Sequence, residues 1–118
     1  MQYALLIYDM RPESDPLPRD AEEAVLERHR ALQRETESRD ELAAVARLRD
    51  QSLARTVRSR GEQIEVADGP YLETKEWLVG FYLLDCADEA AALQRAEQIC
   101  PPQGSVEVRP VRWQRVPG

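Results

Sequence analysis

The sequence predicts an α+β fold, a ferredoxin-like two-layer sandwich, because two helical patterns are interspersed with several strand patterns. The order along the chain is strand, helix, two or three strands, helix and strand. Elements in this order place the helices on one face of a mostly antiparallel sheet. The chain shows no repeat and no evident linker, so we expect residues 1–118 to form a single domain.

The first strand and the first helix are separated by a proline-rich loop. Residues 3–8, YALLIY, are apolar on both faces, as expected of a central strand. Three prolines within residues 9–20 remove backbone donors and exclude a continuous helix or ladder there. Asp20 then fits an N-cap, and we expect the helix to run to about Arg39. The stripe that faces the sheet contains Ala21, Val25, His29, Leu32 and Thr36.

Three strand patterns follow the first helix. Residues 41–48, ELAAVARL, are ambiguous in period, and we favour a strand or an extended segment there. Residues 54–68 are typical of a hairpin that turns at Arg60 and Gly61. Residues 77–85, WLVGFYLLD, give the clearest strand pattern, with eight consecutive apolar or glycine residues.

The last two elements are a second helix and a final strand. Asp88 fits an N-cap, and Pro101 ends the helix. One side of this helix is expected to carry Leu93, Ala96, Ile99 and Cys100. Residues 105–110, SVEVRP, point Val106 and Val108 inward, which indicates a strand with one wet face.

The predicted sheet has one face that no helix of the chain covers. Residues 77–85 nevertheless lack the polar alternation of a strand with a solvated face. An exposed apolar sheet face requires a partner, and pairing two such sheets about a twofold axis is the simplest arrangement. We therefore expect a homodimer.

Composition and charge exclude several classes of protein. A formal charge of −6 opposes a phosphate-binding surface, so we expect no nucleic-acid partner. No apolar run approaches the roughly 20 residues that span a bilayer, and the N-terminal residues lack signal-peptide features, which indicates a cytoplasmic protein without a membrane partner. Two cysteines and one histidine supply too few ligands for a structural zinc site, and no glycine-rich phosphate loop is present. We expect no metal and no cofactor.

The segment before the clearest strand carries several charged side chains. Residues 68–70, Asp-Gly-Pro, are typical of a sharp turn. Glu73, Lys75 and Glu76 then place an ammonium between two carboxylates. Either these charges neutralise one another as a loop clamp, or one of them is desolvated at a cleft and acts as a general acid or base. Lys75 is the one lysine beside 15 arginines, which favours a position where the two cations are not equivalent.

His29 is the single histidine, and its unperturbed pKa lies close to physiological pH, near 6.5. Its place between Val25 and Leu32 on the stripe points the ring toward the sheet or its rim. Two interpretations stay open at this point. The ring is either a structural group hydrogen-bonded to a neighbour, or a proton shuttle.

Several motifs in one order resemble the DGPF group of the YCII-related family. They are ADGPYLETKEWLVGFYLLD, with RTVRSRG before it and CPPQGSVEVRPV after it, and the opening strand is similar too. The resemblance implies a ferredoxin-like subunit that forms a dimeric α/β barrel. It implies little about reaction, because related barrels host isomerases, monooxygenases and dehalogenating lyases. Some members of the family are encoded beside extracytoplasmic-function sigma factors.

The chain departs from the pattern of this group at several positions. Tyr71 stands in place of the motif phenylalanine, and Leu72 replaces an alanine. Val79 takes the first of two usual glycines, whereas Gly80 is kept. Asp40 takes the place of the glycine that closes the first helix.

The resemblance also implies a His and Asp pair. His29 fills the histidine role, and Asp40 and Asp68 are both candidates for its partner. We expect a cleft between the first helix and the sheet, near the charged turn, that binds a small polar organic molecule. His29 shuttles a proton there and Asp68, Glu73 or Lys75 orients the molecule or stabilises charge, in lyase or isomerase chemistry. The alternative is a binding module without catalysis that serves a sigma-factor system.

Overall fold

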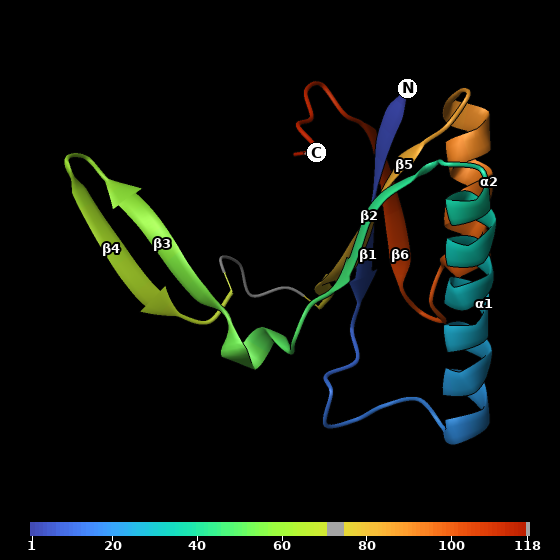
Figure 1. Cartoon of the computed structure of the whole chain (residues 1–118). Helices are drawn as coiled ribbons and strands as arrows, with labels where there is room; N and C mark the ends of the chain where they lie inside the picture. The colour runs from blue at the N-terminus through green and yellow to red at the C-terminus, as the bar shows by residue number, and fades with distance from the viewer. Residues whose placement is uncertain (71–74, 118) are drawn as a thin grey trace.

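The computed structural model describes residues 1–70 and 75–117. Its main body has two layers, an antiparallel sheet and two helices that lie side by side on one face of it (Figure 1). The strand order β2-β5-β1-β6 confirms the α+β class and is consistent with a ferredoxin-like sandwich. The sheet contains β1 (Gln2–Asp9), β2 (Leu42–Arg47), β5 (Trp77–Asp85) and β6 (Ser105–Pro110). The helices are α1 (Arg19–Ser38) and α2 (Glu89–Ile99).

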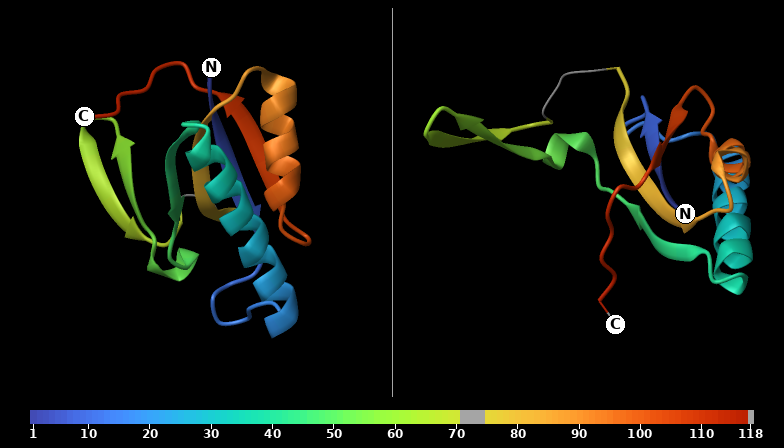
Figure 2. Two further views of the ribbon diagram at one scale, coloured as in Figure 1. Left: turned by 45° about the vertical axis from the view of Figure 1, so that its right-hand side comes forward. Right: turned by 90° about the horizontal axis from the view of Figure 1, so that it is seen from above.

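A separate two-stranded hairpin stands between β2 and β5 in the chain. It consists of β3 (Arg55–Arg60) and β4 (Gln63–Asp68) and follows the short 3-10 helix η1 (Gln51–Leu53). Gly61 has a φ of 60° at the turn, a conformation that glycine adopts without steric cost. The hairpin projects from the body on the side of the sheet opposite to the helices (Figures 1 and 2). The predicted hairpin is confirmed, but it does not join the main sheet.

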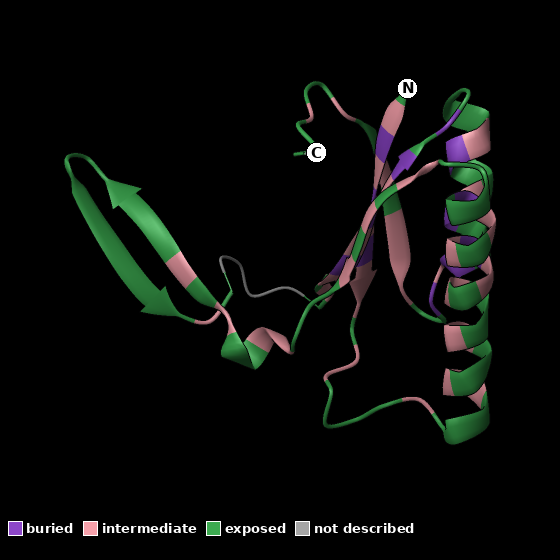
Figure 3. Cartoon of the chain, viewed as in Figure 1, coloured by how far each residue is buried: buried purple, intermediate pink, exposed green. Residues whose placement is uncertain are grey.

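The core lies between the sheet and the helices (Figure 3). Successive side chains of a strand point to opposite faces, so alternate residues of β1 and β5 reach the helix side. The sheet buries Leu5, Tyr82 and Leu84 there, and the helices contribute Leu32 and Ile99. Complete burial of one such aliphatic side chain contributes about 1.5–3 kcal/mol to the free energy of unfolding.

The opposite face of the sheet is apolar and incompletely covered. Leu6, Tyr8, Phe81 and Leu83 are half-buried there, and Leu78 is 37% exposed. These five residues, which we call the open sheet face, come together because Leu6 pairs with Phe81 and Tyr8 pairs with Leu78 across β1 and β5. Among the described residues, neither α-helix lies on this side of the sheet (Figure 1).

The N-terminus of α1 differs from the prediction. The helix begins at Arg19 after Pro18, and no side chain caps it, so the expected Asp20 N-cap is wrong. The Glu22 amide donates to the Pro18 carbonyl at 2.9 Å, which closes the first turn earlier than expected. Proline suits this entry because its fixed φ needs no rearrangement and its missing N–H is not required there. Asp20 instead lies in the first turn, where its charge interacts favourably with the helix dipole.

The second helix follows its prediction at the start and departs from it on one face. Asp88 caps α2 by accepting the Ala91 amide at 2.9 Å, as expected. The buried side carries Ala92, Ala96 and Ile99, whereas Leu93 is 45% exposed, so the expected grouping of Leu93 with Ala96 and Ile99 on one side is wrong. Neighbouring residues of a helix differ by about 100° in direction, which turns Leu93 away from the sheet. No helix in the described part of the chain is long and apolar enough to cross a membrane.

Candidate functional site

A cleft of about 330 Å³ lies between α1 and the sheet. The sequence predicts a cleft between these elements but beside the charged turn, and no described residue of that turn lines the observed cleft. Its walls come from α1, β1, β2 and β5, and its rim comes from the loops that follow β1 and β2. The apolar part of the lining includes Val25, Leu26, Val45, Trp77 and Val79. The cleft lies within the size range of small-molecule sites, about 300–1,000 Å³.

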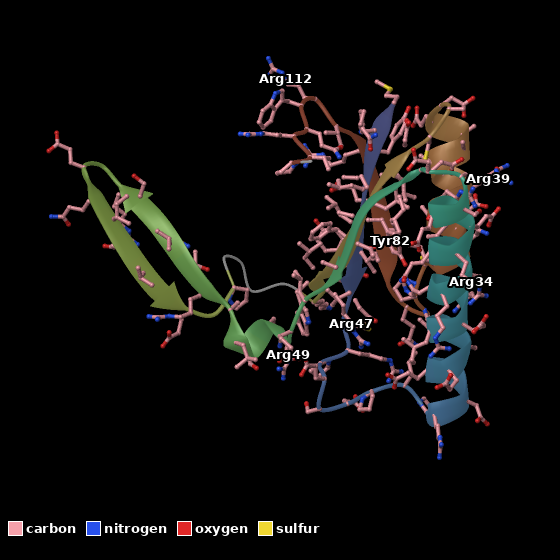
Figure 4. All side chains as sticks on the ribbon, viewed as in Figure 1. Arg34, Arg39, Arg47, Arg49, Tyr82 and Arg112 are labelled. Atoms are coloured by element: carbon pink, nitrogen blue, oxygen red, sulfur yellow. The ribbon has the colours of Figure 1, made fainter. Side chains whose placement is uncertain are left out.

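His29 and Tyr82 form a hydrogen-bonded pair in this cleft. Nδ1 of His29 lies 2.8 Å from the Tyr82 hydroxyl oxygen, and the two rings stack with centroids 5.8 Å apart. Gln33, one turn after His29 on α1, donates from Nε2 to the same hydroxyl at 3.2 Å. Tyr82 meets both side chains because it occupies the helix side of β5, in the centre of the body (Figure 4).

This pairing engages Nδ1 of His29 and leaves Nε2 for a bound molecule. Within the described residues, Nε2 makes no hydrogen bond. When the Tyr82 hydroxyl donates to Nδ1, Nε2 carries the ring proton. When Nδ1 donates to the Tyr82 oxygen, Nε2 has a free lone pair. The hydroxyl is compatible with both forms, so the ring can release or accept a proton at Nε2.

The surroundings keep both rings of this pair uncharged at neutral pH. Burial lowers the pKa of His29 from its ordinary 6.5, and the positive charges of Arg47 and Arg28 lower it further. Burial raises the pKa of Tyr82 above 10.0. A neutral imidazole is the form that can act as a general base.

An ion-pair and hydrogen-bond network fixes the rim of the cleft. The Glu13 carboxylate accepts from Arg49 at 3.1 Å and from the Asp50 amide at 2.8 Å. The Asp50 carboxylate in turn accepts the Glu13 amide at 2.8 Å. The Arg49 guanidinium lowers the pKa of the Glu13 carboxyl, and the hydrogen bond from the Glu13 amide lowers the pKa of the Asp50 carboxyl. The pairs are exposed, so their main effect is to hold the loop after β1 against the end of β2 rather than to stabilise the fold.

The other residues predicted for the site lie away from the cleft. Asp68 ends β4 with a carboxylate that is 93% exposed and lies 3.2 Å from Arg55. Lys75 is exposed, and neither Lys75 nor Asp68 lines the cleft. Glu73 lies outside the described residues. Catalytic roles for these three residues stay predictions.

The hydrogen-bond partner of His29 is a phenol rather than a carboxylate. Asp40 closes α1 with a φ of 57°, the left-handed conformation that the glycine of the family pattern adopts easily. Its side chain is exposed and does not line the cleft. Among the described residues, no Asp or Glu side chain is hydrogen-bonded to His29.

The sequence analysis missed Tyr82, Gln33 and Arg47. Two of them carry a signal that was present in the sequence. Gln33 lies four residues after His29 and therefore shares its helix face. Tyr82 alternates with Leu84 along a buried strand, so its hydroxyl required a partner from the covering helix. Arg47 carries no such signal, because its position depends on how β2 pairs with β5.

Comparison with known proteins assigns the family. Residues 1–114 match the YCII-related domain. The chain belongs to the YCII-related family. An uncharacterized protein of Rhizobium meliloti (strain 1021), R00369, is 39% identical over 114 residues, which cover 94% of this chain and 92% of that protein. The family resemblance noted in the sequence is thereby confirmed.

Among residues 1–70 and 75–117, no group of three or more His, Cys, Asp or Glu side chains is placed to hold a metal ion. The two cysteines of this YCII-related chain, Cys86 and Cys100, are free thiols. Burial raises the pKa of the Cys86 thiol, which opposes formation of the reactive thiolate.

We expect an NMR titration of the single histidine to give a pKa below 6.5, because burial and two arginines disfavour its charged form. The unfolded chain then binds more protons than the folded chain below about pH 6.5, so the His29 contribution to stability is lost as pH falls through its folded pKa. Arg47→Gln should move the pKa upward, and Arg34→Gln, on the outer face of α1, should not. A wild-type pKa above 6.5 would indicate a carboxylate partner and contradict this arrangement.

Proposed function

We propose that the protein binds a small organic molecule in the cleft and moves a proton on it through His29, in lyase or isomerase chemistry. The observation that supports this is the 2.8 Å contact between His29 Nδ1 and the Tyr82 hydroxyl. It orients a neutral ring so that Nε2 is left for the molecule. Shielded clefts that contain a titratable group with a perturbed pKa are common at catalytic sites.

The chemistry follows from the two forms of the His29–Tyr82 pair. The Nε2 lone pair takes a proton from a carbon next to a carbonyl group, and the Nδ1–H donates to the Tyr82 oxygen and stabilises the imidazolium. Return of the proton to a different carbon completes an isomerisation. Departure of a neighbouring group with its bonding electrons, followed by transfer of the Nε2 proton to that group, completes an elimination. General catalysis of this type contributes about 10²–10⁴ in rate.

The test is deuterium exchange of carbon-bound protons in D₂O, followed by NMR over a panel of small ketones and lactones. The wild type is expected to exchange an α-proton of some members, and His29→Gln should slow this by about 10²–10⁴. Tyr82→Phe keeps the ring and removes only the hydroxyl, so a smaller loss is expected. Exchange that is equal in wild type and His29→Gln would contradict the proton shuttle. Ligand binding without any exchange would support a binding module without catalysis.

The proposal includes a homodimer that closes two open sheet faces into an α/β barrel, as the family resemblance implies. The β3–β4 hairpin offers a second apolar surface for the same contact. Val57, Ile64 and Val66 share one face of it because Val57 pairs with Val66 and Ser59 with Ile64. These three side chains are 67%, 66% and 56% exposed in the single chain, which favours their burial by a second copy.

A further inference from the structure

We propose that the cleft takes a small organic carboxylate and that Arg47 binds its carboxylate group beside His29. This inference rests on the proposed function and specifies the class of molecule that the same site binds. It is carried by the arginines of the cleft and by the electrostatics of His29.

Arg47 is placed to bind an anion. It is the last residue of β2, opposite Gly80 of β5 and at the lower end of the sheet edge in Figure 4. It lines the cleft, and no Asp or Glu oxygen among the described residues lies within 4.0 Å of its guanidinium. Arg49, two residues later, is by contrast paired with Glu13 at 3.1 Å. A guanidinium without a carboxylate partner in a cleft wall is suited to bidentate binding of a carboxylate.

Arg11 is a second arginine of the same cleft. It follows β1, and its Nε atom is buried without a hydrogen-bond partner among the described residues. A buried donor without an acceptor is destabilising, so buried polar groups are normally paired. Arg11 therefore adds a second positive charge to the cleft lining, which favours a ligand carboxylate.

The electrostatics of His29 indicate the same ligand charge. The pKa of His29 is lowered partly by the positive charge of Arg47, which lies on the facing strand. An anion between the two offsets that charge and stabilises the imidazolium. The two equilibria are linked: the bound anion raises the pKa of His29, and protonation of His29 strengthens binding of the anion. In the proposed reaction, this places an electrostatic partner beside the ring when it holds the transferred proton.

The remaining charges around His29 favour a monoanion. Asp9 from β1 and Glu22 from α1 line the same cleft and oppose a second negative charge on the ligand. Arg28 lies on α1 beside His29 and lowers its pKa together with Arg47. Glu13, Arg49 and Asp50 are engaged with one another at the rim. The single negative charge of a carboxylate matches these surrounding charges better than the two charges of a phosphate dianion.

The hydrocarbon part of the ligand has its own surface. Val25 and Leu26 from α1, Val45 from β2 and Trp77 from β5 line the cleft. Burial of apolar ligand area against these side chains favours binding. A molecule with one carboxylate and an apolar body therefore fits both parts of the lining.

Three probes test the inference by NMR: benzoate, its neutral counterpart benzamide, and inorganic phosphate. Benzoate is expected to shift the His29 ring signals saturably and to raise the His29 pKa. Its affinity should rise as pH falls through that pKa. Arg47→Gln should weaken benzoate at least tenfold, whereas Arg34→Gln, an exposed arginine paired with Glu27 on the outer face of α1, should leave it unchanged.

Four results would overturn the inference. They are equal binding of benzamide and benzoate, a phosphate effect as large as that of benzoate, unchanged benzoate affinity in Arg47→Gln, and no saturable benzoate effect. The exchange assay keeps this test separate from the proposed function. Benzoate binding without any exchange would support the anion site and contradict the proposed catalysis. Exchange on neutral ketones without benzoate binding would support the proton shuttle and contradict the anion site.

Discussion

Gly80→Ala is expected to lower the free energy of unfolding by about 1–3 kcal/mol, the usual cost of forcing a methyl group into a packed site. A Cβ atom at this position would lie 2.7 Å from the Ala46 carbonyl oxygen and 3.5 Å from the Arg47 Cα atom. Both contacts are with the backbone of β2, so no side-chain rotation can relieve them. The edge strand that carries Arg47 would have to move.

The stabilisation that alanine gives the strand backbone is smaller than the cost of this clash. Alanine is favoured over glycine in a strand by about 0.5–1 kcal/mol, because glycine loses more backbone entropy on folding. Urea unfolding measures the net change, and amide exchange at Leu48, which donates to the Val79 carbonyl at 2.8 Å, reports the displacement of the strand edge. Benzoate affinity should fall in the same variant, since Arg47 moves with β2. Unchanged stability and unchanged Leu48 protection would show that β2 accepts the methyl group.

Local patterns in the sequence predicted part of the fold. Periodicity identified β1, β5 and α2 because long apolar patterns depend on local geometry alone. The start of α1 was predicted wrongly because Asp20 and Pro18 are both plausible at a helix N-terminus, and the Glu22 amide contact decides between them. The hairpin was predicted, but its separation from the main sheet depends on tertiary pairing that no local pattern encodes.

The candidate site shows the same division between local and long-range information. His29 was found from the helical stripe, and its direction toward the sheet was correct. Its partner Tyr82 lies 53 residues away, and only the pairing of β5 with β1 and β2 brings it under α1. Asp40 and Asp68 were candidates for the aspartate that the family resemblance implies, and both are exposed outside the cleft. Charge and titration chemistry can be read from a sequence, but proximity across a sheet cannot.

Leu83→Asp is expected to convert the proposed homodimer into a folded monomer. Leu83 belongs to the open sheet face, pairs with Ala4 of β1 and Ala44 of β2, and is half-buried in the single chain. In a twofold dimer the substitution occurs twice in one interface, so two unpaired carboxylates become buried. Each costs several kcal/mol, and about 1.4 kcal/mol equals a tenfold change in affinity. A loss of dimer affinity of at least about 100-fold follows.

Sedimentation equilibrium of wild type and variants measures this change, with circular dichroism as the test of folding. Leu93→Asp is the matched control, since it makes the same substitution at a 45% exposed leucine of α2, on the opposite side of the molecule. It should leave the dimer intact. Val66→Asp places the charge on the apolar face of the hairpin and should weaken the dimer if the hairpin contributes to it. A wild-type monomer, or a Leu83→Asp dimer as strong as the wild type, would exclude the open sheet face as the interface.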